Sequence, residues 1–162
     1  MTIKAWHFVG DSLRDGRPIP PDGEWLVHEG PVTMCNTGLH ASRRIMEAIF
    51  YAPGSVICRV ECDDVVDEHH DKLVCRRRKI LWRVDGDELL RDFARRCALD
   101  VVHLWDAPQV VIDYLSTGDE SLQDRARNAA WDAARAAARA AAWEKQNRRL
   151  TAMVCAAHRR AP

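Results

Sequence analysis

The residues best suited to chemistry lie in one short stretch, where His40 and Ser42 precede two arginines at the predicted start of a helix. The Ser42 hydroxyl is a good N-cap because it can accept a hydrogen bond from an unpaired N–H of the first turn. Arg43 and Arg44 would then stand in that turn, where the helix dipole disfavours cations. Exposed N–H groups, two guanidiniums and an imidazole favour an anion, so the pattern predicts a phosphate-binding site. The alternative is that both arginines point into water.

A second group of cations runs from Arg76 to Lys79 inside a strand-like segment. Consecutive cations on a strand are costly unless they face water or an anion. One interpretation is a second anion contact, made by Arg76 and Arg78. The other is a basic edge strand that discourages pairing between sheets.

Cysteine and histidine are frequent enough to raise the question of a metal site. The six cysteines include no Cys-x-x-Cys pair, and Cys58 and Cys62 are four residues apart on one predicted strand. That spacing spans about 13 Å, whereas zinc holds each sulfur at about 2.3 Å. His69 and His70 fall in a predicted acidic connection over residues 63–71, where adjacent side chains point apart. We therefore predict buried free thiols and no metal site.

The elements that must position these residues form a small sheet with helices. Alternation predicts a strand over residues 2–9, with His7 on the face of Ile3, Ala5 and Val9. A tight turn is expected at Gly38. Further strands are predicted at residues 24–28, 31–35, 55–62 and 72–84.

The period becomes helical from Asp85 onward. Asp85 and Glu88 fit a capping box. The helix that follows carries an apolar stripe from Leu89 to Leu104, which is predicted to face the core. A shorter helix over residues 110–115 ends before Gly118.

From Asp119 the composition shifts to alanine, the strongest helix former, without Gly or Pro up to residue 161. This predicts one helix over residues 119–160 and a division into an α+β domain, 1–118, and a helical tail, 119–160. The fold class is therefore α+β: a small mixed or antiparallel sheet with packed helices, followed by one long Ala-rich C-terminal helix.

The tail also carries a candidate self-association stripe. Trp131, Arg135, Arg139 and Trp143 repeat every four residues, and the alanines beside them allow a second backbone to approach closely. Because tryptophans are costly to leave in water, we predict a homo-oligomer through this helix. A tail folded back on its own domain is the alternative.

Composition bounds the function classes. The 162 residues are 47% hydrophobic, and 24 basic residues balance 24 acidic ones, which does not favour nucleic-acid binding. No run of about 18 apolar residues predicts a membrane span, and the first residues lack the features of a signal peptide. A cytoplasmic location with reduced thiols is expected.

Nearly the whole chain resembles a family of uncharacterised bacteriophage and prophage proteins, with no assigned activity, and the implied location is the cytoplasm of a bacterial host. The motifs that carry the resemblance are Lys4-Ala-Trp-His-Phe, Gly38-Leu-His-Ala-Ser42, Tyr51-Ala-Pro-Gly54, Cys58-Arg-Val-Glu-Cys62, Leu73-Val-Cys-Arg-Arg-Arg78 and the Ala/Trp/Arg tail.

Residues 3–62 also resemble the ADP-ribosyltransferase superfamily: a strand bearing a His, a Gly-x-His/Tyr-x-Ser/Thr turn, and a helix ending in Tyr-Ala. The resemblance implies that His7 contacts the ribose of NAD and that His40 and Ser42 form the second motif. Tyr51 would lie near the nicotinamide. Those enzymes generally use a late-strand Glu or Gln. Here Glu61 comes too early, and Glu88 lies on a predicted helix.

Three hypotheses follow. The first is a phage-type accessory protein that binds a phosphate-bearing ligand, a nucleotide or an NAD-like molecule, with ADP-ribosyl transfer as the implied chemistry. The second is a non-enzymatic phage protein that binds a host protein or sequesters a signalling nucleotide. The third is a nucleic-acid binder that uses Arg76 to Lys79 and the basic end of the tail. No cofactor is required by the residues themselves, and NAD is the one that the resemblance implies.

Overall fold

The structure, a computed structural model, describes residues 2–158, with side chains for residues 2–140 and Trp143. It divides into two units, which we describe separately: unit 1 up to Leu90 and unit 2 from Arg91. The boundary between the units therefore falls well before Gly118, whereas the sequence predicted a domain boundary directly after Gly118. Helices that were assigned to the first domain belong to the second unit instead.

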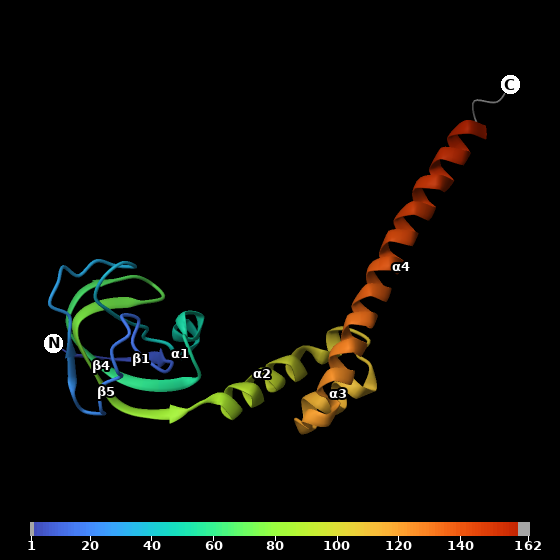
Figure 1. Ribbon diagram of the computed structural model, residues 1–162. Helices are drawn as coiled ribbons and strands as arrows, with labels where there is room; N and C mark the ends of the chain where they lie inside the picture. Colours follow the sequence, from blue (N-terminus) through green and yellow to red (C-terminus); the bar gives the residue numbers. More distant parts are fainter. Residues whose placement is uncertain (1, 159–162) are drawn as a thin grey trace. The chain divides into compact units, whose positions relative to one another are not determined.

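Unit 1 is built on an antiparallel sheet in which β4 and β5 form a long, curved hairpin (Figure 1). The spatial order is β1-β4-β5-β2, and β3 pairs with another part of β5. The bounds are β1 Ile3–Val9, β2 Trp25–Val27, β3 Leu39–Ala41, β4 Val56–Glu68 and β5 Leu73–Asp85. The strand predicted at residues 31–35 is absent. Most of that segment belongs instead to the turn that leads into β3.

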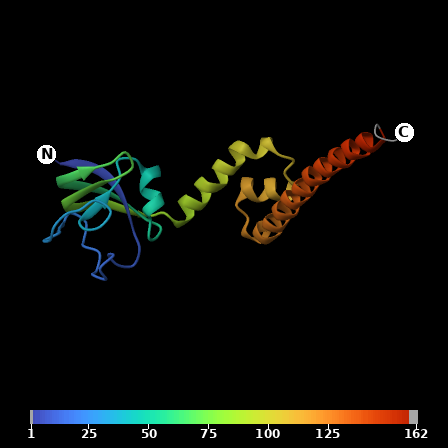
Figure 2. The ribbon, with the colours of Figure 1, turned by 90° about the horizontal axis from the view of Figure 1, so that it is seen from above.

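The sheet closes on itself into a small barrel (Figures 1 and 2). β1 pairs with β4, β4 with β5, and β5 with β3. The last contact is made by Ser42, directly after β3, which exchanges backbone hydrogen bonds of 2.7 and 2.9 Å with Trp6 of β1. Two register shifts in the β4–β5 pairing, between Arg59 and Val60 and between Val65 and Asp67, supply the bend that closure requires. Asp64, just before the second shift, has a positive φ of 52°.

Alternation along the strands separates a core face from an outer face. Ala5 and Val9 of β1 point into the barrel, as the sequence predicted, and meet Val60, Cys62, Leu73 and Cys75. On the opposite face of β1, Phe8 is buried against Ala48 and Ile57. That cluster is covered by the short α1, Ile45–Ala48, and the 3₁₀ turn η1, Ile49–Tyr51.

The loop over residues 10–24, between β1 and β2, is held to β5 by one side chain. Arg83 donates to the carboxylate of Asp22 at 2.7 Å and to the carbonyl of Pro20 at 2.8 Å. Ile19 of this loop packs on the barrel core. The loop is therefore fixed against the sheet.

Unit 2 is helical. α3 ends at Gly118, whose φ of 70° suits the left-handed C-cap position. α3 and the first part of α4 pack against each other, with Ala126 of α4 buried (Figures 1 and 2). The bounds are α2 Asp87–Val101, η2 Val102–Leu104, α3 Gln109–Thr117, η3 Glu120–Leu122 and α4 Gln123–His158; α2 begins in unit 1.

The predicted fold class is wrong in its C-terminal half. Residues 119–158 do not form one helix that follows a complete domain, and the last two residues of the predicted helix, 159 and 160, lie outside the described residues. Asp119 instead caps the 3₁₀ turn η3 by accepting from the N–H of Ser121 at 2.9 Å, and α4 starts only at Gln123. The first part of α4 packs against α3, so the two helices belong to one helical unit. The side chains of α4 are described up to Ala140 and for Trp143. The break is explained by Asp119, because its short carboxylate side chain bonds to a backbone N–H and so competes with the hydrogen bonds of a continuous helix.

The prediction for the apolar stripe of α2 is also wrong. Asp85 marks the helix start, since its carboxylate accepts from the N–H of Asp87 at 3.1 Å. No residue of α2 is buried, however, and Leu89, Phe93 and Val101 are exposed. Within the described structure, Leu90 packs against the cluster of Phe8, Ala48 and Ile57, but the stripe from Phe93 onward does not face a core.

Candidate functional site

The predicted anion site at a Ser42-capped helix does not form. α1 has four residues, and its cap position is Arg44, with extended backbone and no side-chain cap. Ser42 is buried, and its N–H and C=O bond to Trp6 instead. Strand closure therefore claims the residue that the sequence assigned to a helix cap.

The two arginines of that prediction bind carboxylates of the chain. Arg43 forms a forked pair with Glu68, with Nη2 at 2.8 Å from Oε2, and these hydrogen bonds lower the pKa of Glu68. Arg44 is 77% exposed in its side chain and lies 3.6 Å from Glu47. Ser42, Arg43 and Arg44 are thus not brought together around a common point.

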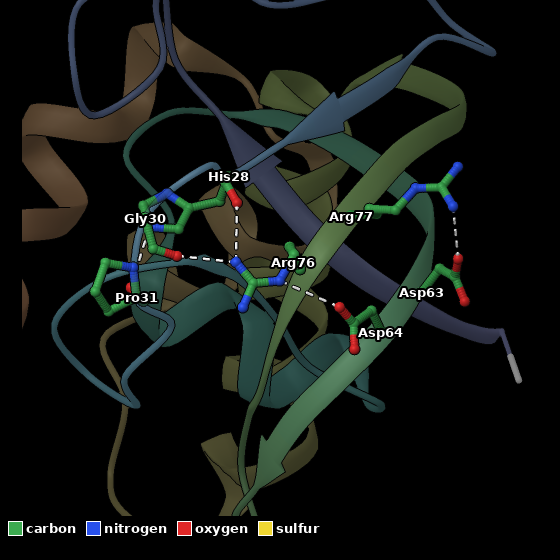
Figure 3. A network of polar contacts seen from close by, with 7 residues as sticks. All are labelled: His28, Gly30, Pro31, Asp63, Asp64, Arg76 and Arg77. Atoms are coloured by element: carbon green, nitrogen blue, oxygen red, sulfur yellow. Dashed lines mark hydrogen bonds and ion pairs between the residues drawn. The ribbon is translucent and has the colours of Figure 1, made fainter.

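The cations of β5 are largely neutralised by β4 (Figure 3). Arg76 donates to Asp64 at 3.2 Å and to the carbonyls of Gly30 and His28 at 2.9 and 3.4 Å. Arg77 pairs with Asp63 at 3.1 Å. Lys79 pairs in the same way with Glu61 at 3.0 Å.

Both sequence interpretations of Arg76 to Lys79 need correction. β5 is a central strand, with β4 on one side and β2 and β3 on the other, so it is not a basic edge. The segment 63–71 is not a plain connection either, since β4 continues to Glu68. Arg76 is committed to internal partners and does not form the predicted anion contact.

Arg78 differs from its neighbours because it points into the barrel. It lies opposite Cys62 in the β4–β5 register and is only 6% exposed. Its guanidinium donates to the carbonyl of His40, and no carboxylate of the described residues pairs with it. Burial lowers the pKa of Arg78, whereas the thiols of Cys58, Cys62 and Cys75 favour its charge. Arg78 is thus a buried cation surrounded by thiols.

His7 and His40 lie on opposite faces of the sheet. His7 stands between Trp6 and Phe8 and so shares the core face of Ala5 and Val9. His40 stands between Leu39 and Ala41, whose side chains pack in that core, and so faces outward. Burial, with Arg78 and His40 as further causes, lowers the pKa of His7 well below its usual value. The two imidazoles do not share a cleft.

The His40 ring is held as a neutral imidazole in an electropositive setting. Its Nε2 accepts from the N–H of Cys35 at 3.1 Å, and a further hydrogen bond joins the ring to the backbone of Gly38. Burial lowers the pKa of His40, and the charges of Arg78, Lys72 and Arg14 lower it further. The hydrogen bonds tie up the ring, and cations gather around it.

Tyr51 is linked to the His40 ring by Lys72, which contacts Tyr51 and whose charge acts on His40. The ammonium of Lys72 is 3.3 Å from the Tyr51 hydroxyl and 4.7 Å from the ring centroid. The same ammonium hydrogen-bonds to Cys35, which raises the pKa of Lys72. The Tyr51 hydroxyl in turn donates to Asp71. We call Arg14, Cys35, His40, Tyr51 and Lys72 the His40 surface.

The sequence patterns indicated His40 and Tyr51 but not the other three members of the His40 surface. Arg14 lies in a long polar loop, and Cys35 was interpreted as the end of a strand. One available signal was Gly38, because a turn there folds the chain so that the N–H of Cys35 reaches the ring of His40. Lys72 could be placed only once β5 was known to pair with β3.

Two other features are absent from the part of the chain that the structure describes. No group of three or more His, Cys, Asp or Glu side chains there could hold a metal ion. Within the same part of the chain, no helix combines the length and apolar character needed to cross a bilayer. The cysteines at 58, 62 and 75 are buried free thiols, and those at 35 and 97 are exposed.

Comparison with known proteins gives one match. Residues 3–92 match the model of a family described as a domain of unknown function, DUF7666. The chain belongs to the DUF7666 family. The matched segment covers the barrel and ends within two residues of the boundary between the units. No curated protein and no solved structure matches the chain.

Proposed function

We propose that the barrel of this DUF7666 chain is a binding module for a phosphate-bearing ligand, taken up at the His40 surface. The observation that carries the proposal is the contrast between two groups of cations. Arg43, Arg76, Arg77 and Lys79 all meet carboxylates. Around His40, the charges of Arg78, Lys72 and Arg14 lower the imidazole pKa. The His40 surface itself carries two cations, Arg14 and Lys72, against the carboxylate of Asp71, which accepts from Tyr51 and interacts with Lys72. A surface with net positive charge attracts an anion.

A nucleotide fits this surface better than inorganic phosphate does. Phe50, next to Tyr51, is 82% exposed and offers a flat apolar face on which a base can stack. Lys72, in contact with Tyr51, would then reach the phosphates. A nucleotide would thus make an aromatic contact through its base and a charged contact through its phosphates.

The proposal is for binding without turnover. ADP-ribosyl transfer as implied by the resemblance requires His7, His40 and Tyr51 in one cleft, whereas His7 faces the core. NAD therefore enters only as a candidate ligand. A phage-type accessory protein in the bacterial cytoplasm is the setting that we propose, and the buried free thiols are compatible with a reducing compartment.

The test is titration calorimetry with ADP, NAD, ADP-ribose and pyrophosphate. Lys72→Met and Arg14→Met should each weaken nucleotide binding by about tenfold, as expected for a charged hydrogen bond. Arg44→Met is the matched control, because it removes an exposed arginine from outside the His40 surface. Phe50→Ala should weaken the nucleotides but leave pyrophosphate unchanged.

Two results would contradict the proposal. One is the absence of heat and of thermal stabilisation with every probe at millimolar concentration, which would favour the host-protein alternative. The other is equal loss of affinity in Arg44→Met and Lys72→Met. That result would indicate general attraction by positive charge rather than a site.

A further inference from the structure

One apolar surface of unit 2 has no partner in the described structure. On α2 and η2, Phe93, Cys97, Val101 and Leu104 recur at the three- and four-residue spacing of one helix face. All four are exposed, Leu104 to 72%. We call these four residues the α2 stripe. Helix faces of this kind are normally buried against another element.

The remainder of unit 2 covers a different side of α2. Arg91 pairs with Glu120 at 3.2 Å, and the guanidinium of Arg95 lies against Gly118. At 100° per residue, positions 91 and 95 point well away from the centre of the α2 stripe. The contacts to α3 and η3 therefore leave the stripe open.

We propose that the α2 stripe is the interface of a homodimer, in which α2 packs antiparallel against α2 of a second copy about a two-fold axis at Cys97. In this arrangement Cys97 meets its own counterpart, and Phe93 of one copy meets Val101 of the other. A two-fold axis makes every such contact twice. This surface is distinct from the α4 stripe predicted from the sequence and from the His40 surface.

Charge along the edge of the stripe identifies a second copy as the occupant. Arg96 and Asp100 flank the same side of the stripe, one on each side of Cys97 along the helix axis. In the antiparallel pair, Arg96 of each copy comes close to Asp100 of the other. In a parallel pair about a two-fold axis, this edge would instead face the alanine edge of the other copy, and neither charge would gain a partner. A second copy carries the complementary charges by symmetry.

The ion pair that Arg96 makes within its own helix does not prevent it from pairing with Asp100 of a second copy. Arg96 pairs within its own helix with Asp92 at 2.8 Å, but the Arg96 side chain is 74% exposed. Exposed pairs of this kind hold a side chain weakly. On the opposite edge, Ala94 and Ala98 are small enough for two helix backbones to approach.

Sedimentation equilibrium of the full chain tests the interface. Wild type should dimerise, and Val101→Glu should be monomeric at the same concentration. Arg96→Asp and Asp100→Arg should each raise the dimer Kd by about tenfold, because each replaces two attractive pairs by repulsive ones. The double variant with both changes should recover to within about threefold of wild type.

Disulfide cross-linking tests the register in which the two α2 helices pair. In a chain with Cys35→Ser and Cys155→Ser, a copper(II)–phenanthroline oxidant should join two copies through Cys97. Both thiols lose their protons as two electrons pass to the oxidant. Adding Cys97→Ser should abolish the product. Circular dichroism confirms that each variant keeps its helices.

The rival surface is tested in the same series. Trp131→Ala, which removes a 62% exposed ring from α4, should leave the dimer unchanged. A wild-type chain that stays monomeric at all concentrations would overturn the proposal. So would a dimer that Trp131→Ala dissociates and Val101→Glu does not.

Discussion

The guanidinium of Arg78 donates a hydrogen bond to the backbone carbonyl of His40, which joins the inside of the barrel to the strand that closes it. β3 is only three residues long, and one bridge between Ser42 and Trp6 completes the closure. The short strand that completes the closure is thus held to β5 by a cation with no carboxylate partner among the described residues, in addition to its backbone pairing. Burial lowers the pKa of Arg78, so this contact comes at an electrostatic cost.

Replacing Arg78 with a residue of similar length should change stability little. Arg78→Met loses one hydrogen bond, about 1 kcal/mol, but removes a buried charge that lacks a carboxylate partner. We expect the free energy of unfolding in urea to stay within about 1 kcal/mol of wild type. Arg78→Ala should lose about 3 kcal/mol because it leaves a cavity. A loss of that size in Arg78→Met would show that the charge itself stabilises the fold.

Acidification should destabilise the protein through His7. Burial lowers the pKa of His7 in the folded chain, so between the unfolded value, about 6.5, and the folded one only the unfolded chain binds the proton. The contribution of His7 should be constant above about pH 6.5 and fall as the pH decreases.

The measurement for His7 is the free energy of unfolding from pH 8 to pH 5. His7→Leu should flatten the acid side of this profile. His70→Leu changes a side chain that is 92% exposed and should keep the wild-type profile. A steeper acid loss in His7→Leu than in wild type would contradict the argument.

Two glycine substitutions separate backbone strain from steric conflict. Gly38 and Gly16 both have positive φ, 106° and 83°. A Cβ at Gly38 would also come within 2.8 Å of Val32 and Val74, whereas nothing lies within 4 Å at Gly16. Gly16→Ala should cost about 1 kcal/mol of unfolding free energy and Gly38→Ala clearly more, on the order of 3 kcal/mol. Equal costs would mean that the turn at Gly38 adapts freely.

The β4–β5 hairpin should not bind nucleic acid at physiological salt. Asp63 and Glu61 already occupy Arg77 and Lys79. Fluorescence anisotropy with a labelled single strand should therefore show no binding by wild type. The double variant Glu61→Gln with Asp63→Asn frees both cations and should gain weak, salt-dependent affinity. Salt-dependent binding by wild type would instead favour the nucleic-acid alternative, in which the basic end of the tail, outside the described side chains, also takes part.

How far the sequence predicts this structure depends on the range of the contacts involved. Local signals located the strand bearing His7, the turn at Gly38 and the end of α3 at Gly118 correctly. Ser42 was misassigned because a serine before a helix and a serine in a strand bridge look alike until its partner, Trp6, is known. Likewise, nothing local shows that the α2 stripe lacks a core to face.

The pairing of Arg77 with Asp63 was within reach of sequence reasoning. Acidic residues before the connection and basic ones after it are placed symmetrically about a point near His70, which is the pattern of an antiparallel hairpin. The distinct position of Arg78 was not within reach. It depends on the bend of β4, and no residue pattern predicted the register shifts that produce that bend.

The ladder of opposite charges also makes the hairpin self-aligning. A slip by two residues, the smallest that keeps each strand's faces, would leave Glu61 opposite Leu81 or Asp63 opposite Cys75. Either slip loses one of the two ion pairs on the outer face. Strands from two copies are discouraged in the same way, since β5 would meet the like charges of β5. The charges of β4 and β5 thus select the correct pairing of these two strands during folding, before any ligand or partner is present.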